Sequence, residues 1–567
     1  MVLCACVAGL ALSLAGVVSA QQQRPDAGTL SEPQRQIPAL PPTGGPRITV
    51  PTPVPASTPA STVPITPAAF RIQGNTLIDS GALLALLQPR VGKTTHLQGL
   101  QEAAAEVRKY YVERGYLLTD AYLPEQALPA QGGTVTIAVV EARMGSVRVR
   151  VEGAGISQAR AQAMVSAQLR RGDPITEYLL DKPVLLLRDL AGHDATAVVE
   201  PGARTGEVDV LVTVKSQGPV FETSVGADNQ GTRAAGAVRA FAEMQVNNPS
   251  GHGDQLGARV QLGEISRTRL YRLAYTISAG NLGSRLTLGA TRTEYALGKQ
   301  FAVLGATGRA DVLSAAVLHP LVRSRSRNLF ATLSAEHKRL DDRLLLAPSS
   351  QRSISALRMG VSGNQLDDAL GTGGFTSVAL NAALGRARLD DATLLLDQGV
   401  TGLRTAGSFG KLNLEVQRAQ YFSGPISLYG TLQAQHASRN LSSAEKMSLG
   451  GPTGVRGYPV GEAVGDSGVI ANIEARYALS ATGAFGEAAN LSFFYDTGMV
   501  RFNQDGAIVA GNANRTSLSA YGIGFLAGRP GNFLLSASLA WRAGGKAPTT
   551  GDPDSRPRLW LSTQKWF

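Results

Sequence analysis

An arginine in a glycine-rich loop and an aspartate on a later strand are the residues whose types and positions predict a specific interaction. Arg456 lies within GGPTGVRGYPVGEAVGDSG, residues 450–468, where glycines allow the backbone to fold back tightly. Asp496 lies within FFYDTG, residues 493–498. A buried arginine needs an acidic partner because an isolated buried charge is costly, so we predict a bidentate Arg456–Asp496 ion pair. The alternative is an exposed arginine and a hydrated aspartate, which would contribute little stability.

Alternation around Asp496 predicts the direction of its side chain. In an extended strand, successive side chains point to opposite faces. One face is apolar throughout: Leu491, Phe493 and Tyr495. The opposite face carries Phe494, Asp496 and Gly498. If the first face is turned to lipid, Asp496 faces the interior of a barrel, where a loop that folds inward could reach it.

Residues 219–567 contain the segments that must position this pair. Helical periodicity is absent, and about sixteen segments of roughly ten to fourteen residues alternate between apolar and polar positions. A soluble β-sandwich would also alternate, but repetition over about 350 residues without a helix favours a closed transmembrane antiparallel β-barrel with a polar inside. The predicted strands are 219–230, 233–246, 254–265, 268–281, 284–297, 307–319, 327–338, 352–364, 374–385, 408–422, 425–439, 467–479, 489–499, 515–528, 531–543 and 557–567.

The loop that carries Arg456, residues 440–466, is the eleventh connection of this barrel. If the preceding domains are periplasmic, odd-numbered connections face outward and should be the longer ones. The two longest connections, 386–407 and 440–466, are the ninth and the eleventh. We predict that residues 440–466 fold back into the lumen. The chain ends with RLWLSTQKWF, an alternating strand that closes on Phe567.

The region before the barrel predicts export and two repeated domains. Residues 1–20 are apolar and end in Val-Ser-Ala, which is typical of a signal peptide and its cleavage site. Residues 21–67 are rich in Pro, Thr, Ser and Gln and predict an extended linker, with a short helix near 26–36 as one interpretation. Residues 68–143 and 144–218 both follow the order β-α-α-β-β, an internal repeat of about 75 residues.

Composition argues against several functional classes. The net charge is +11, but Lys and Arg are dispersed without a basic block, so we expect no nucleic-acid partner. Cys4 and Cys6 both lie in the predicted signal peptide, which leaves no thiol chemistry or zinc-thiolate site in the mature chain. The six histidines show no metal-ligand spacing, and VGKTT at 91–95 lacks the earlier glycine of a phosphate loop. We therefore expect no catalytic site, metal or cofactor, and the chain is not expected to be an enzyme.

Several motifs in order resemble one known family. VRGY (Val455, Arg456, Gly457, Tyr458) with FYDTG (Phe494, Asp496 and Gly498 in an F-x-D-x-G pattern) is similar to the paired signature of two-partner secretion transporters, the haemolysin secretion/activation (TpsB) family. FRIQGNT (70–76), the Y-x-x-x-G-Y at 111–116, the E-A-R ending the first repeat and LLLRDLAG (185–192) resemble polypeptide-transport-associated (POTRA) domains. The terminal Phe567 resembles the recognition signal of outer-membrane barrels, although Lys565 occupies a position that is usually apolar.

This resemblance implies a fold and a function. It implies two periplasmic POTRA domains, POTRA 1 (68–143) and POTRA 2 (144–218), and an outer-membrane barrel of sixteen strands (219–567). In the family, the loop arginine pairs with the strand aspartate, and many members carry an N-terminal plug helix. The prolines of residues 21–67 argue against such a helix near 26–36.

The implied function is ATP-independent export of a large partner exoprotein of haemolysin or adhesin type. The implied partners are the exoprotein's N-terminal secretion domain, outer-membrane lipid and the barrel-assembly machinery that inserts the chain. The main alternative is an outer-membrane protein assembly factor, which usually carries more POTRA repeats. A passive porin would not need the periplasmic domains.

Overall fold

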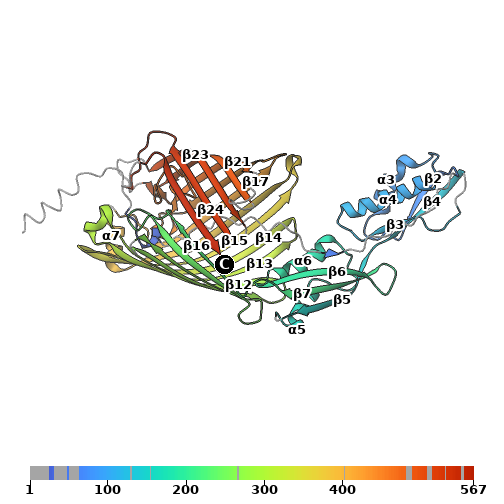
Figure 1. Cartoon of the computed structure of the whole chain (residues 1–567), viewed down its shortest axis with the longest axis horizontal. Helices are drawn as coiled ribbons and strands as arrows, with labels where there is room; N and C mark the ends of the chain where they lie inside the picture. Colours follow the sequence, from blue (N-terminus) through green and yellow to red (C-terminus); the bar gives the residue numbers. More distant parts are fainter. Residues whose placement is uncertain are drawn as a thin grey trace, which may run out of the picture.

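The computed structural model describes most of the chain as two small domains attached to one end of a barrel (Figure 1). The described residues are 24–30, 48–49, 63–127, 131–153, 155–264, 267–400, 402–479, 488–506, 514–529, 531–550 and 555–567. The predicted signal peptide, residues 1–20, lies outside them, as does most of the predicted linker. Within these ranges, no helix is long and apolar enough to cross a membrane.

Sixteen antiparallel strands close into a barrel in which the last strand pairs with the first. The prediction of a closed barrel with about sixteen strands is therefore confirmed. The strands are β8 (Phe221–Asp228), β9 (Arg239–Asn247), β10 (Gln255–Gly263), β11 (Thr268–Ala279), β12 (Ser284–Ala296), β13 (Thr307–Arg323), β14 (Arg327–Leu344), β15 (Ala347–Asp367), β16 (Gly374–Leu389), β17 (Gly407–Tyr421), β18 (Ile426–Ala437), β21 (Ser467–Leu479), β22 (Ala488–Arg501), β23 (Arg515–Arg529), β24 (Phe533–Arg542) and β25 (Arg558–Trp566).

The wall is apolar outside and polar inside because alternate residues of a strand point to opposite faces. On β22, Leu491, Phe493 and Tyr495 are about half exposed on the outer face. Phe494 and Asp496 lie on the inner face and are fully buried.

Four strands extend at least four residues further than the sequence predicted. β13 ends at Arg323, β14 at Leu344 and β16 at Leu389, and β15 begins at Ala347, whereas we expected 319, 338, 385 and 352. The extensions escape prediction because apolar alternation stops there while the backbone ladder continues. The structure also adds a helix that was not predicted, α7 (Asp391–Gln398), in the connection 386–407. The side chain of Asp390 caps it by accepting a hydrogen bond from the Thr393 amide.

POTRA 1 contains β2 (Thr66–Gln73), α3 (Ser80–Leu87), α4 (Leu97–Glu113), β3 (Asp120–Tyr122) and β4 (Gln131–Val140). Its sheet has the order β2-β4-β3, and β2 begins two residues before the expected boundary at 68. The two helices pack on this sheet through a buried cluster that includes Leu100, Val107 and Ile137. The Tyr111 hydroxyl donates a hydrogen bond to Glu141, at 2.8 Å, which links α4 to the chain that leaves β4.

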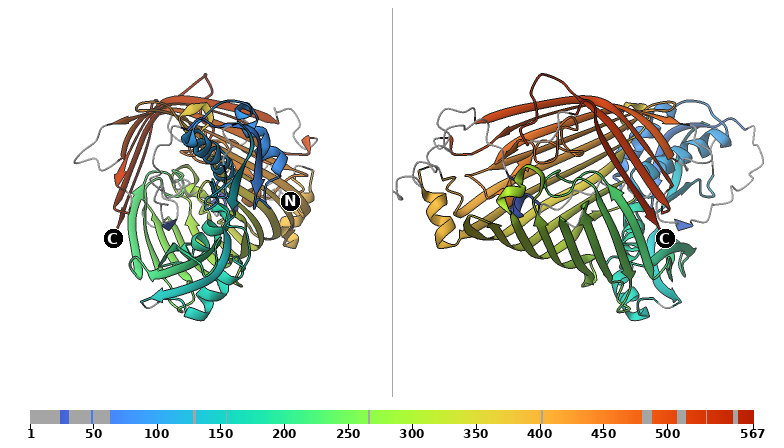
Figure 2. Two further views of the ribbon diagram at one scale, coloured as in Figure 1. Left: turned by 90° about the vertical axis from the view of Figure 1, so that its right-hand side faces the viewer. Right: turned by 60° about the vertical axis from the view of Figure 1, so that its left-hand side comes forward.

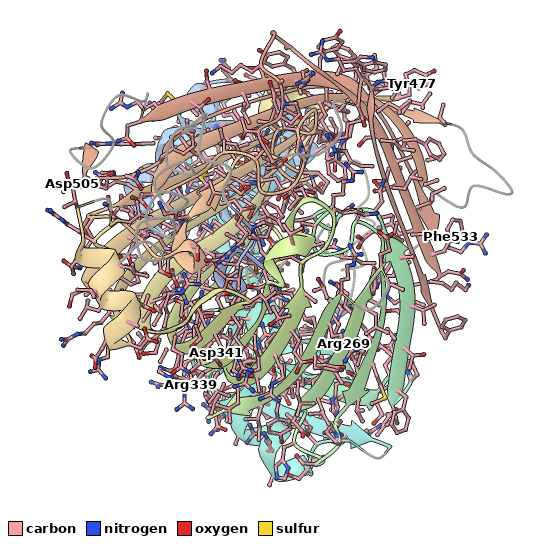
Figure 3. All side chains as sticks on the ribbon, turned by 90° about the vertical axis from the view of Figure 1, so that its left-hand side faces the viewer. Arg269, Arg339, Asp341, Tyr477, Asp505 and Phe533 are labelled. Carbon is pink, nitrogen blue, oxygen red and sulfur yellow. The ribbon has the colours of Figure 1, made fainter. Side chains whose placement is uncertain are left out.

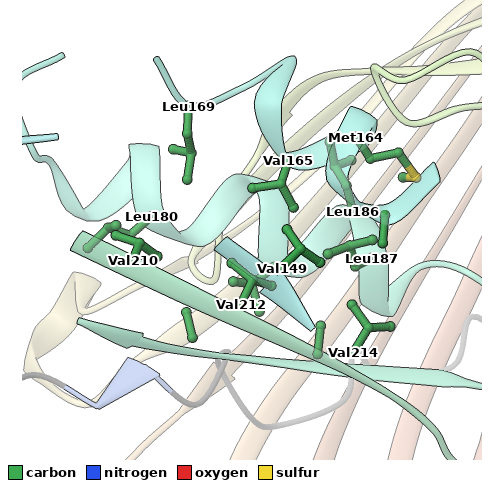
Figure 4. Close-up of a cluster of buried hydrophobic side chains, with 14 of the residues drawn as sticks. Val149, Met164, Val165, Leu169, Leu180, Leu186, Leu187, Val210, Val212 and Val214 are labelled. Carbon is green, nitrogen blue, oxygen red and sulfur yellow. The ribbon is translucent and has the colours of Figure 1, made fainter. Parts of the chain in front are cut away.

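POTRA 2 repeats the arrangement with β5 (Arg143–Glu152), α5 (Gln158–Ser166), α6 (Glu177–Arg188), β6 (His193–Pro201) and β7 (Glu207–Ser216). Figure 4 shows its core, in which Met164, Val165, Leu186 and Leu187 of the helices face the strands. The sheet order is β1-β6-β7-β5. Its edge strand β1 (Ile48–Thr49) belongs to the predicted linker and pairs parallel with β6.

POTRA 2 is joined to the inward turns of the barrel by ion pairs. Arg325, between β13 and β14, donates hydrogen bonds of 2.8 and 2.6 Å to the two oxygens of the buried Asp181 of α6. Arg323 donates hydrogen bonds of 2.9 and 2.7 Å to the two oxygens of Asp189. Two bidentate pairs fix both distance and orientation. In the left view of Figure 2, POTRA 1 and POTRA 2 lie in front of the barrel.

Candidate functional site

The loop of residues 440–466 folds into the barrel. It contains a 3-10 turn, η5 (Ser443–Glu445), and a two-stranded hairpin formed by β19 (Met447–Ser448) and β20 (Val464–Gly465). Its apolar side chains Leu449, Val455 and Tyr458 are almost fully buried against the inner wall. Their wall partners are Ile470, Val500, Leu518 and Ala520.

Arg456, near the tip of the loop, binds two carboxylates of the inner wall. Its Nε donates to Asp496 Oδ2 at 2.9 Å and its Nη2 donates to Asp496 Oδ1 at 2.7 Å. Its backbone N–H also donates to Asp496 Oδ2, at 3.0 Å. Its Nη1 donates to Glu474 Oε1 on β21, at 2.7 Å. The structure thus brings together the two residues for which we predicted an ion pair, and it adds Glu474, which we did not predict.

The surroundings of the guanidinium leave its partners little room to move. The ring of Phe494 stacks on it, with the Arg456 Cζ 3.3 Å from the ring centroid. Asn472 Nδ2 donates to Asp496 Oδ1 at 2.8 Å and to the Gly454 carbonyl of the loop at 2.8 Å. Trp560 Nε1 on β25 donates to the Arg456 carbonyl at 2.8 Å. β21, β22 and β25 therefore all bind the loop tip.

The remaining motif residues allow the loop to approach the wall closely. A Cβ on Gly457 would lie 2.8 Å from the Cβ of Ala520, so any larger residue would push the loop off the wall. A Cβ on Gly498 would lie 3.0 Å from Leu449 Cδ2 and 3.1 Å from the Val469 carbonyl oxygen. The Tyr458 hydroxyl donates to the Lys546 carbonyl at 3.3 Å. These two glycines thus serve close packing between loop and wall.

At its base, the loop is attached to the wall by a second buried carboxylate, that of the loop residue Glu445. Its side chain lies 2.7 Å from Lys411 Nζ, 3.0 Å from Lys338 Nζ and 3.2 Å from Arg358 Nη2. These cations come from β17, β14 and β15. The three basic residues occupy inner-face positions of their strands, but nothing in the local sequence links them to a carboxylate that lies 34 residues from Lys411 and 87 residues from Arg358 along the chain.

Two more acidic residues complete the anchoring of the loop. Asp466 binds Lys446 Nζ at 3.0 Å, and both side chains are buried, so the pair joins the two ends of the loop. Glu462 accepts hydrogen bonds from the backbone N–H and the hydroxyl of Thr549. Together with Arg456 and Glu445, these contacts distribute the attachment over the whole length of the loop.

A short helix from the predicted linker lies against the same loop inside the barrel. This helix, α2 (Ala27–Leu30), occupies part of the range 26–36 in which one was considered, and residues 31–36 lie outside the described residues. Asp26 accepts a hydrogen bond from Arg352 of β15, at 2.9 Å, and one from the Ser443 hydroxyl, at 2.6 Å. The Ala27 amide donates to Asp342 of β14 at 2.8 Å.

Phe567 lies at the seam between the last strand and the first. Its backbone N–H donates to the Thr223 carbonyl of β8 at 2.9 Å, and its ring is exposed on the outer face. Within the part of the chain that the structure describes, no group of three or more His, Cys, Asp or Glu side chains could hold a metal ion.

Family comparisons agree with this architecture. The model described as "Haemolysin secretion/activation protein ShlB/FhaC/HecB" matches residues 206–523, more than half of the chain. The chain belongs to this family. A second model, "POTRA domain, ShlB-type", matches residues 65–142.

Relatives of this family member share most of its length. The heme/hemopexin transporter protein HuxB of Haemophilus influenzae is 26% identical over 89% of this chain and 87% of that protein. The outer membrane transporter CdiB of Dickeya dadantii (strain 3937) is 23% identical over 68% of both proteins.

Solved structures share the fold. CdiB from Escherichia coli has a TM-score of 0.67 at 20% identity and covers 92% of this chain and 93% of its own. BamA from Haemophilus ducreyi lacking POTRA domains 1–3 has a TM-score of 0.51 at 14% identity and covers 89% of this chain and 100% of its own. At 20% and 14% identity, both likenesses show the fold alone. This family member is an outer-membrane transporter whose POTRA domains lie on the periplasmic side, as we expected.

Proposed function

We propose that this transporter exports one or a few large exoproteins and that residues 440–466 close its lumen at rest. The observation that carries the proposal is the buried loop, held at its tip by Arg456 and at its base by Glu445. An element with so many specific contacts inside a pore must move or be retained as a scaffold when a polypeptide passes. We assign the Arg456–Asp496–Glu474 contacts to holding the resting position.

Cargo capture is assigned to the edges of the POTRA sheets. An extended peptide adds to an open sheet edge through main-chain hydrogen bonds, while side-chain pockets give selectivity. Among the described residues, β5 of POTRA 2 and both β2 and β3 of POTRA 1 are edge strands without a neighbour on one side. The opposite edge of POTRA 2, at β6, is occupied by β1.

The proposed path divides the chain as the sequence suggested. Residues 1–20 direct export, and residues 21–67 contain α2 and lead to the periplasmic domains. POTRA 1 and POTRA 2 bind the secretion domain of the cargo, and residues 219–567 form the pore. Phe567 serves insertion of the barrel by the assembly machinery, and the apolar outer face binds outer-membrane lipid. Folding of the cargo outside the cell supplies the direction of transport without ATP.

The relatives suggest what the cargo could be. HuxB matches along nearly nine-tenths of this chain and is named for heme and hemopexin. An exoprotein that scavenges haem is therefore one candidate cargo beside a haemolysin or an adhesin.

The proposal is tested by comparing released and surface proteins of the wild type, a deletion strain and an Arg456→Ala strain. We expect the deletion to remove one or a few large exoproteins and leave other outer-membrane barrels at normal abundance. A general loss of barrel proteins would instead identify an assembly factor. Haem-agarose pull-down of the missing exoprotein distinguishes a haem-binding cargo from the others.

A further inference from the structure

The outer wall of β12–β16 changes from apolar to basic towards the outward end, which is the end away from POTRA 2. Strand register aligns the outer-face residues of these five strands in rows. From the middle of the wall outward, the rows are Leu286–Val317–Leu333–Met359–Ala382, Leu288–Ala315–Ala335–Leu357–Leu384, Ala290–Leu313–His337–Ser355–Arg386 and Arg292–Asp311–Arg339–Ser353–Arg388.

The change marks the level at which hydrocarbon gives way to lipid headgroups. Successive rows on one face are two residues apart, and a strand rises about 3.3 Å per residue at a tilt near 45°, so each row adds about 5 Å in height. The first basic residue, Arg386, is thus one row above the last wholly apolar row. Arg339 and Arg388 are one row higher, at the depth where the phosphates of outer-leaflet lipids lie.

Three of these arginines are available to a ligand. Asp311, which is opposite Arg339 in the strand register, is already bound: it pairs with Arg292, at 2.6 Å, and with Arg309, at 3.0 Å. Arg309 also binds Asp341, at 3.1 Å. Arg339, Arg386 and Arg388 are exposed, and within the described residues no carboxylate lies within ion-pair distance of them. Figure 3 shows Arg339 on the outer side of the wall.

An open groove of about 560 Å³ lies on the wall directly below these arginines. It forms because small side chains on the middle strands lie between leucines. Its outer-face lining is Leu313, Ala315, Ala335, His337, Ser355 and Leu357. The groove is apolar in the middle and ends at His337 and Ser355, one row below Arg339.

We propose that this surface binds an anionic glycolipid of the outer leaflet, with a phosphate on Arg339, Arg386 and Arg388 and an acyl chain in the groove. Arginine suits this ligand because its planar guanidinium can donate two parallel hydrogen bonds to a phosphate and is weakly hydrated. Alanines and a serine between leucines suit an acyl chain because they leave a furrow of its width. The inner faces of the same strands, β14 and β15, carry Lys338 and Arg358, which bind Glu445 of the loop. The site therefore lies on the outer side of the wall that holds the loop base.

The test uses the full-length protein in phosphatidylcholine nanodiscs with fluorescent bisphosphorylated lipid A as the probe. The combined variant Arg339→Gln, Arg386→Gln and Arg388→Gln is expected to bind the probe about tenfold more weakly, since three charge-assisted contacts are lost. Ala335→Phe fills the groove and is also expected to weaken binding. The control is Arg327→Gln, which removes an exposed arginine from the same face of β14 at its inward end and is expected to bind normally.

The outcomes separate the parts of the proposal. Equal binding by the triple variant and the wild type, or an equal loss with Arg327→Gln, would overturn it. Displacement of the probe by inorganic phosphate at concentrations similar to those of unlabelled lipid A would show that the acyl groove contributes nothing, and would also overturn it. Heat-modifiable gel mobility verifies that each barrel is folded. If the triple variant does not fold, Arg388→Gln alone takes its place, with a smaller expected loss.

Discussion

Replacing Arg456 with alanine tests whether the ion pair at the loop tip holds the lumen closed. The Arg456 side chain is 11% exposed and the Asp496 side chain is completely buried. Arg456→Ala would leave Asp496 in this site with two remaining donors, the Asn472 amide and the backbone N–H of residue 456. Breaking a buried pair by removing one partner costs about 3–5 kcal/mol. At about 1.4 kcal/mol per tenfold change, the equilibrium between the held and the released loop would shift by a factor on the order of a hundred to a few thousand.

Single-channel conductance in planar bilayers measures this shift directly. We expect Arg456→Ala to open far more often, or to larger conductance levels, than the wild type. Arg456→Lys should be intermediate because lysine keeps the charge but cannot make the bidentate contact. The matched control is Arg476→Ala, which removes another arginine of the lumen. Arg476 and Glu474 are both on β21, and their side chains lie 2.8 Å apart. Conductance of Arg456→Ala equal to that of the wild type, in a correctly folded barrel, would refute the role assigned to the pair.

Three further predictions concern the N-terminal helix, the domain junction and POTRA 1. A Cβ on Gly28 would lie 2.6 Å from the Ala444 amide nitrogen, so Gly28→Val should release α2 from the loop. The release would be measured as faster thiol labelling of a cysteine introduced by Arg24→Cys. The control Gly545→Val, where a Cβ meets open space, should leave the labelling rate unchanged. The double variant Arg323→Ala, Arg325→Ala should broaden the distribution of spin-label distances between POTRA 2 and the barrel, because both ion pairs are lost. The control Arg327→Ala should leave the width of that distribution unchanged. An unchanged width in the double variant would show that the two ion pairs do not fix the junction. Glu141→Gln should lower the free energy of unfolding of POTRA 1 by about 1–3 kcal/mol at neutral pH, measured by pulse proteolysis in urea. Burial raises the pKa of Glu141, but hydrogen bonds from Thr76, Leu77 and Tyr111 outweigh it and lower that pKa overall, so this stability is present above about pH 4.5, the ordinary value, and is lost as the pH falls through the lowered pKa. A difference between wild type and variant that stays constant in acid would contradict this assignment.

The barrel could be predicted because lipid imposes a strict pattern on its outer face. Alternation identified the region of each strand and the inner face of β22, on which Asp496 lies. Strand ends were predicted poorly where that pattern stops. Asp341 and Arg343 continue β14 at a level where polar residues replace apolar ones on the outer face, so the hydrophobic signal disappears before the hydrogen-bonded ladder does.

The contacts of the loop could be predicted only where a motif marked them. Arg456 stands out because it is a large charge among glycines. Glu445 and Glu462 look like ordinary loop acids, since their partners lie outside the loop: Lys411 is on β17 and Thr549 is in the connection after β24. Pairing across such separations depends on barrel register and on the depth to which the loop enters, which local patterns do not specify.

Arg323 and Arg325 also fix the distance between POTRA 2 and the entrance of the lumen. They hold Asp189 and Asp181 directly against the barrel turn, so the β5 edge of POTRA 2 stands at a constant distance from the entrance of the lumen. A cargo strand bound to that edge would always begin its path from the same point. The number of residues between the bound strand and the first residue to enter the pore then becomes a dimension that cargo and transporter must share. Transporters that anchor POTRA 2 differently would require cargoes with a different spacing, even if their binding edges were identical.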